Sequence, residues 1–273
     1  MNKIMVITFS PTGNTVNAGS AIVKGLSQVV EREVNHLNIT VPANRKMKVV
    51  LDREDVLIIG FPVYAGRVPN KMAGFIEQNI VGVNTPAIGY VTYGNRSPGD
   101  GLSEIFWNLE NHGFLPFAGC TIPSEHAFTS NLAKGRPDGK DIEKLTAFGR
   151  SCGKRFLSGD ISIPNVPGNM PPGPYYIPMK QDGSLAKFLK ATPVTDRKKC
   201  VACGICAEVC PMGSVDRNRL WKVKGICIKC QACIHYCPQD AKYFDDADFL
   251  SHVAMLEEHF VERKEIAFYP AEK

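Results

Sequence analysis

The sequence predicts an α/β protein, with a doubly wound parallel sheet in its first half and a smaller Cys-rich domain near its C-terminal end. Through residues 1–157, short apolar runs alternate with stretches of helical spacing, which is typical of a parallel sheet covered on both faces. Eight of the ten Cys fall between Cys200 and Cys237. Six prolines in residues 161–178 separate the two parts, because such a segment can form neither a helix nor a central strand.

Five apolar runs in the first half are candidate strands. The runs 4–9, 56–60 and 87–93 are short, rich in β-branched or aromatic residues, and bounded by Gly, Pro, Ser or Asp, as buried strands are. The runs 34–39 and 117–122 show the same pattern more weakly. Helical spacing or helix-start signals mark four further segments, at 14–30, 70–79, 100–112 and 141–157.

The chain divides into a sheet domain, a Pro-rich connector, the Cys-rich domain and a helical tail, at residues 1–160, 161–195, 196–247 and 248–273. The connector is expected to be extended and semi-rigid, with one short helix at 185–191. Its adjacent Tyr175 and Tyr176 would be unusual in a freely solvated linker, so we expect the connector to lie against a domain. The tail is expected to be helical over 248–263.

The Cys-rich domain contains an internal repeat. Its two halves, 200–211 and 227–238, share one spacing: three Cys at two-residue gaps, then a Cys-Pro pair. Three such thiolates can surround one [4Fe-4S] cube, and the Cys before the Pro ligates the other cube. Zinc is the alternative, but this doubled spacing is not that of a zinc finger. The predicted ligand sets are therefore crossed: Cys200, Cys203, Cys206 and Cys237 for cluster 1, and Cys227, Cys230, Cys233 and Cys210 for cluster 2.

Residues 197–244 resemble the bacterial two-cluster ferredoxins. All eight ligand positions are present, and so are both prolines, Pro211 and Pro238. The resemblance implies one-electron transfer at low potential. A purely structural or oxygen-sensing role for the clusters is the alternative.

Residues 4–15 combine a strand, a hydroxyl-rich turn and a helix start. Backbone N–H groups at a helix N-terminus, together with Ser and Thr hydroxyls, can bind a phosphate. The Lys of a nucleoside triphosphate loop and the spaced glycines of a dinucleotide fingerprint are both missing here. The turn therefore indicates a terminal monophosphate or, taken alone, an ordinary capped turn.

Two further loops favour the phosphate site, since 61–67 follows the third predicted strand and 92–100 the fourth. In a doubly wound sheet these loops meet at the carboxyl edge near the switch point, where FMN would lie. Residues 1–157 resemble the flavodoxin family, so the predicted fold is a flavodoxin-like five-stranded sheet plus a small α+β two-cluster ferredoxin domain. The resemblance implies phosphate contacts from Ser10, Thr12, Gly13, Asn14 and Thr15. It implies isoalloxazine contacts from Pro62, Val63, Tyr64, Ala65, Gly66, Thr92, Tyr93, Gly94, Asn95 and Gly99.

Among these residues, Tyr64 is the candidate for stacking on the flavin ring, with plain core packing as the alternative. Many flavodoxins have acidic residues around the flavin, whereas Arg67 and Arg96 stand in the corresponding loops here. Because nearby cations favour an anionic reduced flavin, we predict a less negative hydroquinone couple than in an acidic pocket.

The whole chain resembles the flavodoxin–ferredoxin fusion proteins of anaerobes. The implied function is electron transfer between FMN and two [4Fe-4S] clusters, as in an iron–sulfur flavoprotein oxidoreductase. No catalytic residue is assigned, because the cofactors carry the chemistry. One alternative is a flavin-dependent reductase of a quinone, a nitro compound or oxygen that is fed by its own ferredoxin domain. A non-enzymatic redox sensor is the third hypothesis.

The expected partners are redox proteins, either donors or acceptors of the ferredoxin or reductase type. A small-molecule electron acceptor and a homodimer are left open. The formal charge of +5 counts the clustered Cys as neutral, so it does not indicate nucleic-acid binding. No apolar run approaches the roughly 20 residues of a membrane span, and we expect a cytoplasmic protein. The basic residues around the Cys are either a solvated face or a docking surface for an acidic partner.

Overall fold

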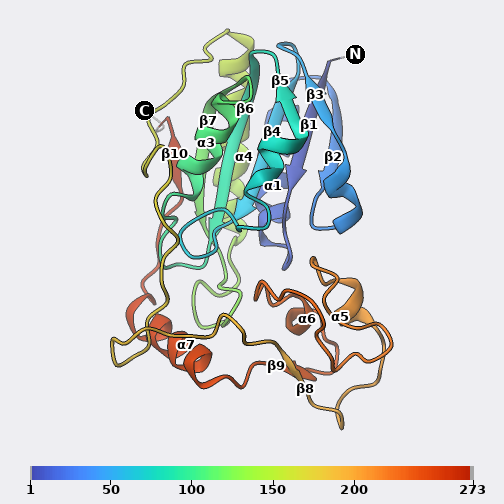
Figure 1. Cartoon of the computed structure of the whole chain (residues 1–273). Coiled ribbons are helices and arrows are strands. Elements are labelled where there is room, and N and C mark those ends of the chain that lie inside the picture. The colour runs from blue at the N-terminus through green and yellow to red at the C-terminus, as the bar shows by residue number, and fades with distance from the viewer. Residues whose placement is uncertain (1, 271–273) are drawn as a thin grey trace.

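The computed structural model describes residues 2–270. The strands of its main sheet are β1 (Lys3–Thr8), β2 (Glu33–Asn38), β4 (Val56–Pro62), β6 (Thr85–Tyr93), β7 (Phe114–Pro123) and β10 (Ala267–Tyr269). Their order is β2-β1-β4-β6-β7-β10, and the first five of these run parallel (Figure 1). That order is the doubly wound arrangement of a flavodoxin-like fold, with its switch point between β1 and β4. The fold class predicted from the sequence is confirmed.

Helices cover both faces of this sheet. They are α1 (Asn14–Ser27), α2 (Gly74–Asn79), α3 (Gly101–Glu110) and α4 (Gly139–Leu157). Helix α4 begins in a capping box, because the Asp138 carboxylate accepts the Asp141 N–H at 3.0 Å and Asp141 accepts the Asp138 N–H at 2.9 Å. The 3-10 helix η1 (Pro42–Lys46) and the short strand pair β3 (Val49–Leu51) and β5 (Ile80–Gly82) extend the domain at one side.

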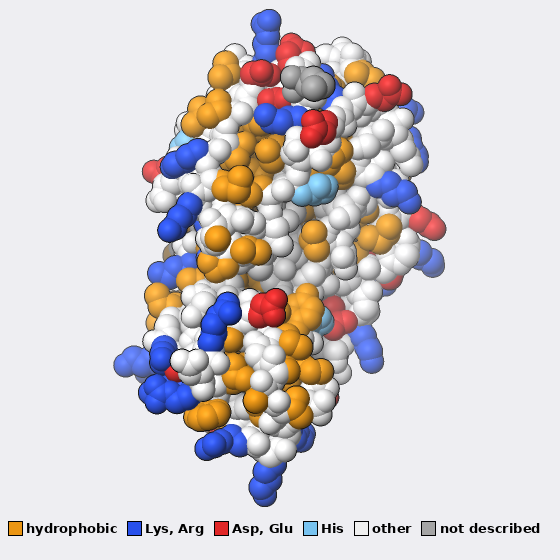
Figure 2. Space-filling view, turned by 90° about the vertical axis from the view of Figure 1, so that its right-hand side faces the viewer, with side chains coloured by type: hydrophobic (Ala, Val, Ile, Leu, Met, Phe, Trp, Pro, Cys, Tyr) orange, Lys and Arg blue, Asp and Glu red, His pale blue; other side chains and the backbone are white. Residues whose placement is uncertain are grey.

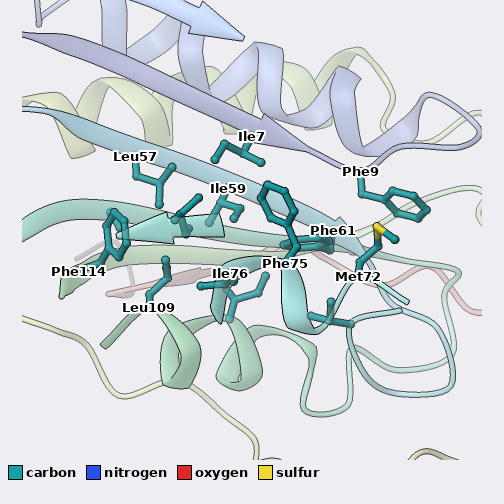
Figure 3. Packing of buried hydrophobic residues seen from close by; sticks show 14 of the residues in the cluster. Ile7, Phe9, Leu57, Ile59, Phe61, Met72, Phe75, Ile76, Leu109 and Phe114 are labelled. Carbon is teal, nitrogen blue, oxygen red and sulfur yellow. The ribbon is translucent and has the colours of Figure 1, made fainter. Parts of the chain in front are cut away.

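Each face of the sheet buries its own apolar cluster. One cluster packs strands β1, β4 and β6 against α2 and α3, through residues such as Ile59, Phe61 and Phe75 (Figure 3). The other packs the opposite face against α1 and α4, through residues such as Ile22 and Phe148. Because both faces are covered, β4 and β6 are almost continuously apolar rather than alternating.

The sheet has a sixth strand that the sequence analysis did not expect. Strand β10 pairs antiparallel with β7, with Phe268 opposite Cys120, so the C-terminal segment completes the sheet begun at the N-terminus. Before it lies α7 (Ala247–His259), which is shorter than the expected helix over 248–263. Residues 260–266 leave the helix to follow the sheet domain, where the Asn95 side chain donates to the carbonyls of Phe260 at 2.6 Å and Glu262 at 2.8 Å.

The connector lies against the sheet domain, but its expected helix at 185–191 does not form. Instead the chain folds back at a turn, in which the Lys180 N–H donates to the Ser184 carbonyl at 2.8 Å. The turn brings Phe188 into contact with Phe249 of α7, at 5.4 Å between ring centroids. A helix here would lose this packing, so the tertiary contact decides the conformation.

The Cys-rich module lies below the carboxyl edge of the sheet (Figure 1). Its elements are β8 (Val194–Thr195), α5 (Ile205–Glu208), α6 (Ala232–His235) and β9 (Lys242–Tyr243), with β8 and β9 paired antiparallel. Arg45 of the sheet domain joins the two parts by donating to the Pro211 carbonyl at 2.6 Å. None of the helices within residues 2–270 combines the length and apolar character needed to cross a membrane.

Candidate cofactor sites

The predicted phosphate loop forms a turn between β1 and α1. Gly13 adopts a left-handed φ of 93°, and α1 begins directly after it. The Ser10 hydroxyl accepts the Val16 N–H at 3.0 Å, and the Thr40 hydroxyl accepts the Ser10 N–H at 2.7 Å. Asn14 is held from outside the loop, since its side-chain amide donates to the Glu125 carbonyl at 3.1 Å. The loop thus presents hydroxyls beside the N-terminus of a helix, the chemistry that binds a phosphate.

Tyr90 supports this loop from within the sheet, a role that sequence analysis missed. Its hydroxyl donates to the Thr15 carbonyl at 3.1 Å, and its ring is fully buried. Gly19 and Gly60 make the space for it, because a Cβ on either would lie 2.0 Å from an atom of the Tyr90 ring or hydroxyl. A Tyr in a buried strand, opposite glycines in a neighbouring strand and helix, was the available signal.

A cavity of about 670 Å³ opens above the phosphate loop at the carboxyl edge of the sheet. Most of the residues predicted to contact FMN line it, namely Ser10, Thr12, Asn14, Thr15, Pro62, Val63, Tyr64, Ala65, Gly66, Thr92, Tyr93 and Gly94. Gly13, Asn95 and Gly99 do not. Asn95 is fully buried and bonds to the segment after α7, and Gly99 packs against the Gly66 backbone with a φ of 51°. These residues shape the loops rather than the cavity.

Much of the remaining cavity wall comes from three segments that were not assigned to the flavin site from the sequence. We call these segments the cover: the connector, the loop at 226–229 of the Cys-rich module, and α7. Their lining residues are Tyr175, Tyr176, Pro178, Phe188, Leu189, Ile226, Cys227, Ile228, Lys229, His252 and Leu256. The loop after β7 contributes further, with His126 and Phe128 among its lining residues.

Two histidines of the wall are held in the neutral form. Burial, together with the nearby His252 and Arg96, lowers the pKa of His126 to about 4. Its Nδ1 accepts the Phe128 N–H at 3.0 Å, which leaves the ring proton on Nε2. Burial also lowers the pKa of His252, although the hydrogen bond between its Nδ1 and the Met179 carbonyl, at 2.8 Å, acts in the opposite direction. Both rings are therefore uncharged near neutral pH.

The two arginines expected beside the flavin differ in position. Arg67 does not line the cavity, and its guanidinium pairs with the buried Glu104 carboxylate through bonds of 2.7 and 2.8 Å. That hydrogen bond is the main reason why the pKa of Arg67 is raised. Arg96 does line the cavity and lies 3.9 Å above the ring of Tyr176. Burial lowers the pKa of Arg96, so its charge is less well solvated than that of a surface arginine.

Tyr64 lines the cavity, and thiols of the Cys-rich module contribute to its electrostatic environment. Its turn is held by the connector because the Tyr176 N–H donates to the Ala65 carbonyl at 2.8 Å. Burial raises the pKa of Tyr64 well above its ordinary value, and the neighbouring thiols of Cys230 and Cys227 raise it further. Tyr64 thus shares the lining of the cavity with Cys227, one of the predicted cluster ligands.

The eight clustered Cys surround two small cavities. Cys200, Cys203, Cys206 and Cys237 line one of them, whereas Cys210, Cys227, Cys230 and Cys233 line the other. These groups have the crossed membership that the spacing predicts, with each Cys before a Pro joined to the opposite half of the repeat. Within residues 2–270, no three His, Cys, Asp or Glu side chains converge closely enough to hold a single metal ion. Four thiols around a space, rather than at one point, suit a cube of iron and sulfur.

The buried Lys242 lines the cavity formed by the first group of thiols. The residue is 3% exposed, and its ammonium donates to the Leu220 carbonyl at 2.5 Å. Burial raises the pKa of both Cys206 and Cys233, and the charge of Lys242 acts against this rise at both thiols. The charge of Lys242 thus favours the thiolate form of one Cys from each set.

Comparison with known proteins identifies the Cys-rich module. Residues 193–216 match the family model described as a 4Fe-4S binding domain. An uncharacterized ferredoxin of Methanocaldococcus jannaschii is 35% identical over 54 residues, which are 18% of this chain and 70% of that protein. This part of the chain belongs to the ferredoxin family. The chain thus joins a sheet domain of flavodoxin-like fold to a ferredoxin domain, which supports a redox function in electron transfer.

Other known proteins are similar to one part of the chain or the other. The delta subunit of an NADH-dependent phenylglyoxylate dehydrogenase from Aromatoleum evansii is 39% identical over 49 residues, and the chain spans about half (53%) of its length. Among solved structures, a flavodoxin from the Archaea has a TM-score of 0.41 at 15% identity, covering 57% of this chain and 99% of that one. Flavodoxin 2 of Bacillus cereus has a TM-score of 0.42 at 16% identity, covering 56% and 99%.

Proposed function

We propose that the chain binds FMN in the cavity and two [4Fe-4S] clusters between the crossed Cys sets, and that it transfers electrons between them. The units would be a flavin domain at 1–160, a connector at 161–195, a ferredoxin domain at 196–247 and a C-terminal segment at 248–273. When bound, FMN supplies a two-electron centre that can also exchange electrons singly, and the clusters supply one-electron centres.

A single observation carries this proposal. The cavity that is lined by the phosphate loop is also lined by Cys227, a ligand of the proposed cluster 2. Tyr64, in the turn after β4, lines the same cavity. A flavin ring in this cavity would therefore meet the ferredoxin domain directly, without a second protein to bridge the two cofactors.

The residues that line the cavity also suggest the order in which electrons would pass between the cofactors. None of the four Cys of the proposed cluster 1 lines the flavin cavity, whereas Cys227 of cluster 2 does. Electrons would thus pass between FMN and cluster 2, and between cluster 2 and cluster 1. The charge of Lys242 acts on a thiol of each set, so it would stabilise the more negative, reduced clusters.

The protein's own residues would bind FMN, orient it and limit its contact with water. Ser10, Thr12, Asn14 and Thr15 would hold the phosphate, and Tyr64 would lie along the ring. The cover supplies apolar side chains such as Phe188 and Leu256 above it. Because residues of the ferredoxin domain line the same cavity, we favour transfer within the protein over reduction of a small substrate, the alternative considered from the sequence.

Cofactor analysis of anaerobically prepared protein is the first test. We expect one FMN and about eight irons per chain, because each cube holds four. Four or fewer irons would contradict the ligand assignment, and a chain without FMN would contradict the cavity assignment.

A matched pair of variants tests the order of transfer. In Cys227→Ala the flavin-facing ligand is lost, so we expect photochemically reduced flavin to be reoxidised at least 10-fold more slowly by the remaining iron–sulfur centre. In Cys203→Ala the ligand lost lies in the other set, so transfer from the flavin to cluster 2 should continue at the wild-type rate. Equal rates in the two variants would overturn the proposed order.

A further inference from the structure

The cluster 1 end of the ferredoxin domain reaches the surface. Cys203 is exposed, and its neighbour Val201 is 62% exposed. Val201 also lines the cavity formed by the cluster 1 ligands. A cluster at this place would lie behind little more than one short loop, which is the arrangement needed for electron exchange with another protein.

Basic side chains surround this loop, and we call them the basic rim. Its members are all exposed: Arg197, Lys198, Lys199, Arg217, Arg219 and Lys222. The two parts of the rim lie side by side, because the Arg197 guanidinium is 4.3 Å from the ring of Trp221. Leu220, in the second part, lines the cluster 1 cavity. Figure 2 shows Lys and Arg side chains gathered at the outer edge of the lower lobe, with apolar side chains between them.

Few carboxylates balance the rim. Asp216 is 7% exposed and pairs with Lys224 at 2.6 Å and with Arg219 of the rim at 3.4 Å. Asp196 instead accepts the backbone N–H groups at 198 and 199. Exposed carboxylates of the domain are Glu208, Asp240 and Asp245, set against the six cations of the rim. The rim therefore keeps an excess of positive charge facing the solvent.

The centre of the same surface is apolar. Trp221 is 46% exposed and Val201 is 62% exposed, although burying either apolar side chain would be favourable in free energy. An apolar centre inside a charged rim is the usual anatomy of a protein–protein interface, and the rim charges set the association rate and the choice of partner. Because the rim is positively charged, a partner with an acidic surface would be complementary to it.

We propose that the basic rim, with Val201 and Trp221 at its centre, is the docking site of an acidic one-electron carrier protein that exchanges electrons with cluster 1. This rests on the proposed function, since cluster 1 must be present and redox-active. In each encounter the carrier is oxidised by one electron as cluster 1 is reduced by one, and no proton moves. Two encounters therefore supply the two electrons of one flavin reduction.

The experiment compares the reduction of the chain by two donors in anaerobic stopped-flow, with the bleaching of the clusters as the readout. The protein donor is a reduced acidic two-cluster ferredoxin, and the small donor is the cationic radical of methyl viologen. The variant is Lys198→Glu/Lys199→Glu, and the control is Lys24→Glu/Lys140→Glu, which reverses two exposed lysines of the flavin domain.

With the acidic ferredoxin at low salt, we expect the rim variant to react at least 10-fold more slowly than the wild type, and this difference should shrink as salt is added. The control should react at the wild-type rate, and viologen should reduce the rim variant no more slowly than it reduces the wild type. Equal rates of ferredoxin oxidation by the rim variant and the wild type would overturn the proposal. An equal slowing with both donors would also overturn it, because a changed cluster potential would then be the cause. Failure of the proposed function would look different: the clusters would bleach while the flavin stayed oxidised.

Discussion

The flavin domain buries an apolar cluster on each face of its sheet, whereas the ferredoxin domain has only a small one of its own and shares another with the connector and α7. Cys206, Ala207, Val215 and Leu220 form the buried part of the small cluster, and Cys210 and Cys233 pack against it. Half of these six side chains are proposed cluster ligands. The ferredoxin domain therefore has little apolar area to hold it folded once the metal is gone, and its cross-links must come from iron and sulfur.

Removing the iron should produce the largest difference between the two domains, because it should unfold the ferredoxin domain and leave the flavin domain folded. With the clusters extracted by a chelator under reducing conditions, we expect the amides of 196–246 to exchange with solvent at nearly unprotected rates, because metal binding supplies most of their folding free energy. Amides of β1, β4 and β6 should keep their protection. Hydrogen exchange read by mass spectrometry is the measurement, and a ferredoxin domain that stays protected without iron would contradict the comparison.

Breaking the Arg67–Glu104 pair should destabilise the flavin domain and leave the iron–sulfur clusters in place. Glu104→Gln leaves the Arg67 guanidinium without its carboxylate in a site where Glu104 is 2% exposed, so we expect the flavin domain to lose about 3–5 kcal/mol of unfolding free energy. The iron–sulfur absorbance should survive in the folded protein. Glu110→Gln, an exposed carboxylate of the same helix, is the control and should change stability by less than about 0.5 kcal/mol. Similar losses in the two variants would show that burial of the pair is unimportant.

A smaller change tests the packing beneath the phosphate loop. In Gly60→Ala the new Cβ would meet the Tyr90 ring at 2.0 Å, which the ring cannot avoid without moving, so we expect a loss of about 1–3 kcal/mol and weaker FMN binding. Gly139→Ala is the matched control, since nothing lies within 4 Å of its added Cβ. Chemical denaturation of both variants checks the difference. A Gly60 variant as stable as the control would mean that Tyr90 can move freely.

Acid should lower the stability of the flavin domain slightly, through His126 in the cavity wall. His126 has a pKa of about 4 in the fold, against about 6.5 in an unfolded chain, so it binds a proton on unfolding between these values. Its contribution is complete above pH 6.5 and falls as the pH drops toward 4. We expect a loss on the order of 1–2 kcal/mol in the flavin-free chain, less than full burial would give because the ring lines a cavity. His126→Gln should flatten this part of the pH profile in thermal unfolding, and an unchanged profile would show that another group is responsible.

Local patterns predicted the parts of both sites that depend on neighbouring residues. The Cys spacing predicts which thiols share a cavity, because two-residue gaps fix their positions within one turn of chain. The hydroxyl-rich loop at 10–15 likewise forms within a single turn and the start of one helix. Contacts between residues far apart in the sequence have no such local pattern. Cys227 was assigned as a ligand, but nothing in the neighbouring sequence showed that it also lines the flavin cavity.

Two further features depended on long-range contacts in the same way. The pairing of Phe268 with Cys120 joins positions almost 150 residues apart, and three residues of β10 carry too little pattern to predict a strand. Residues 185–191 have helical spacing, yet Phe188 packs on Phe249 in an extended chain. In both segments tertiary packing overrides a weak local preference.

The return of the chain to β7 through β10 gives the ferredoxin domain two tethers to one body. A domain held by a single linker samples a large volume, and its encounter with a neighbouring site is governed by an effective concentration that falls as the linker lengthens. Here the connector holds one end and the segment from α7 to β10 holds the other. The ferredoxin domain cannot swing away and dock again, so the spacing of the cofactors would be a fixed property of the fold, independent of dilution.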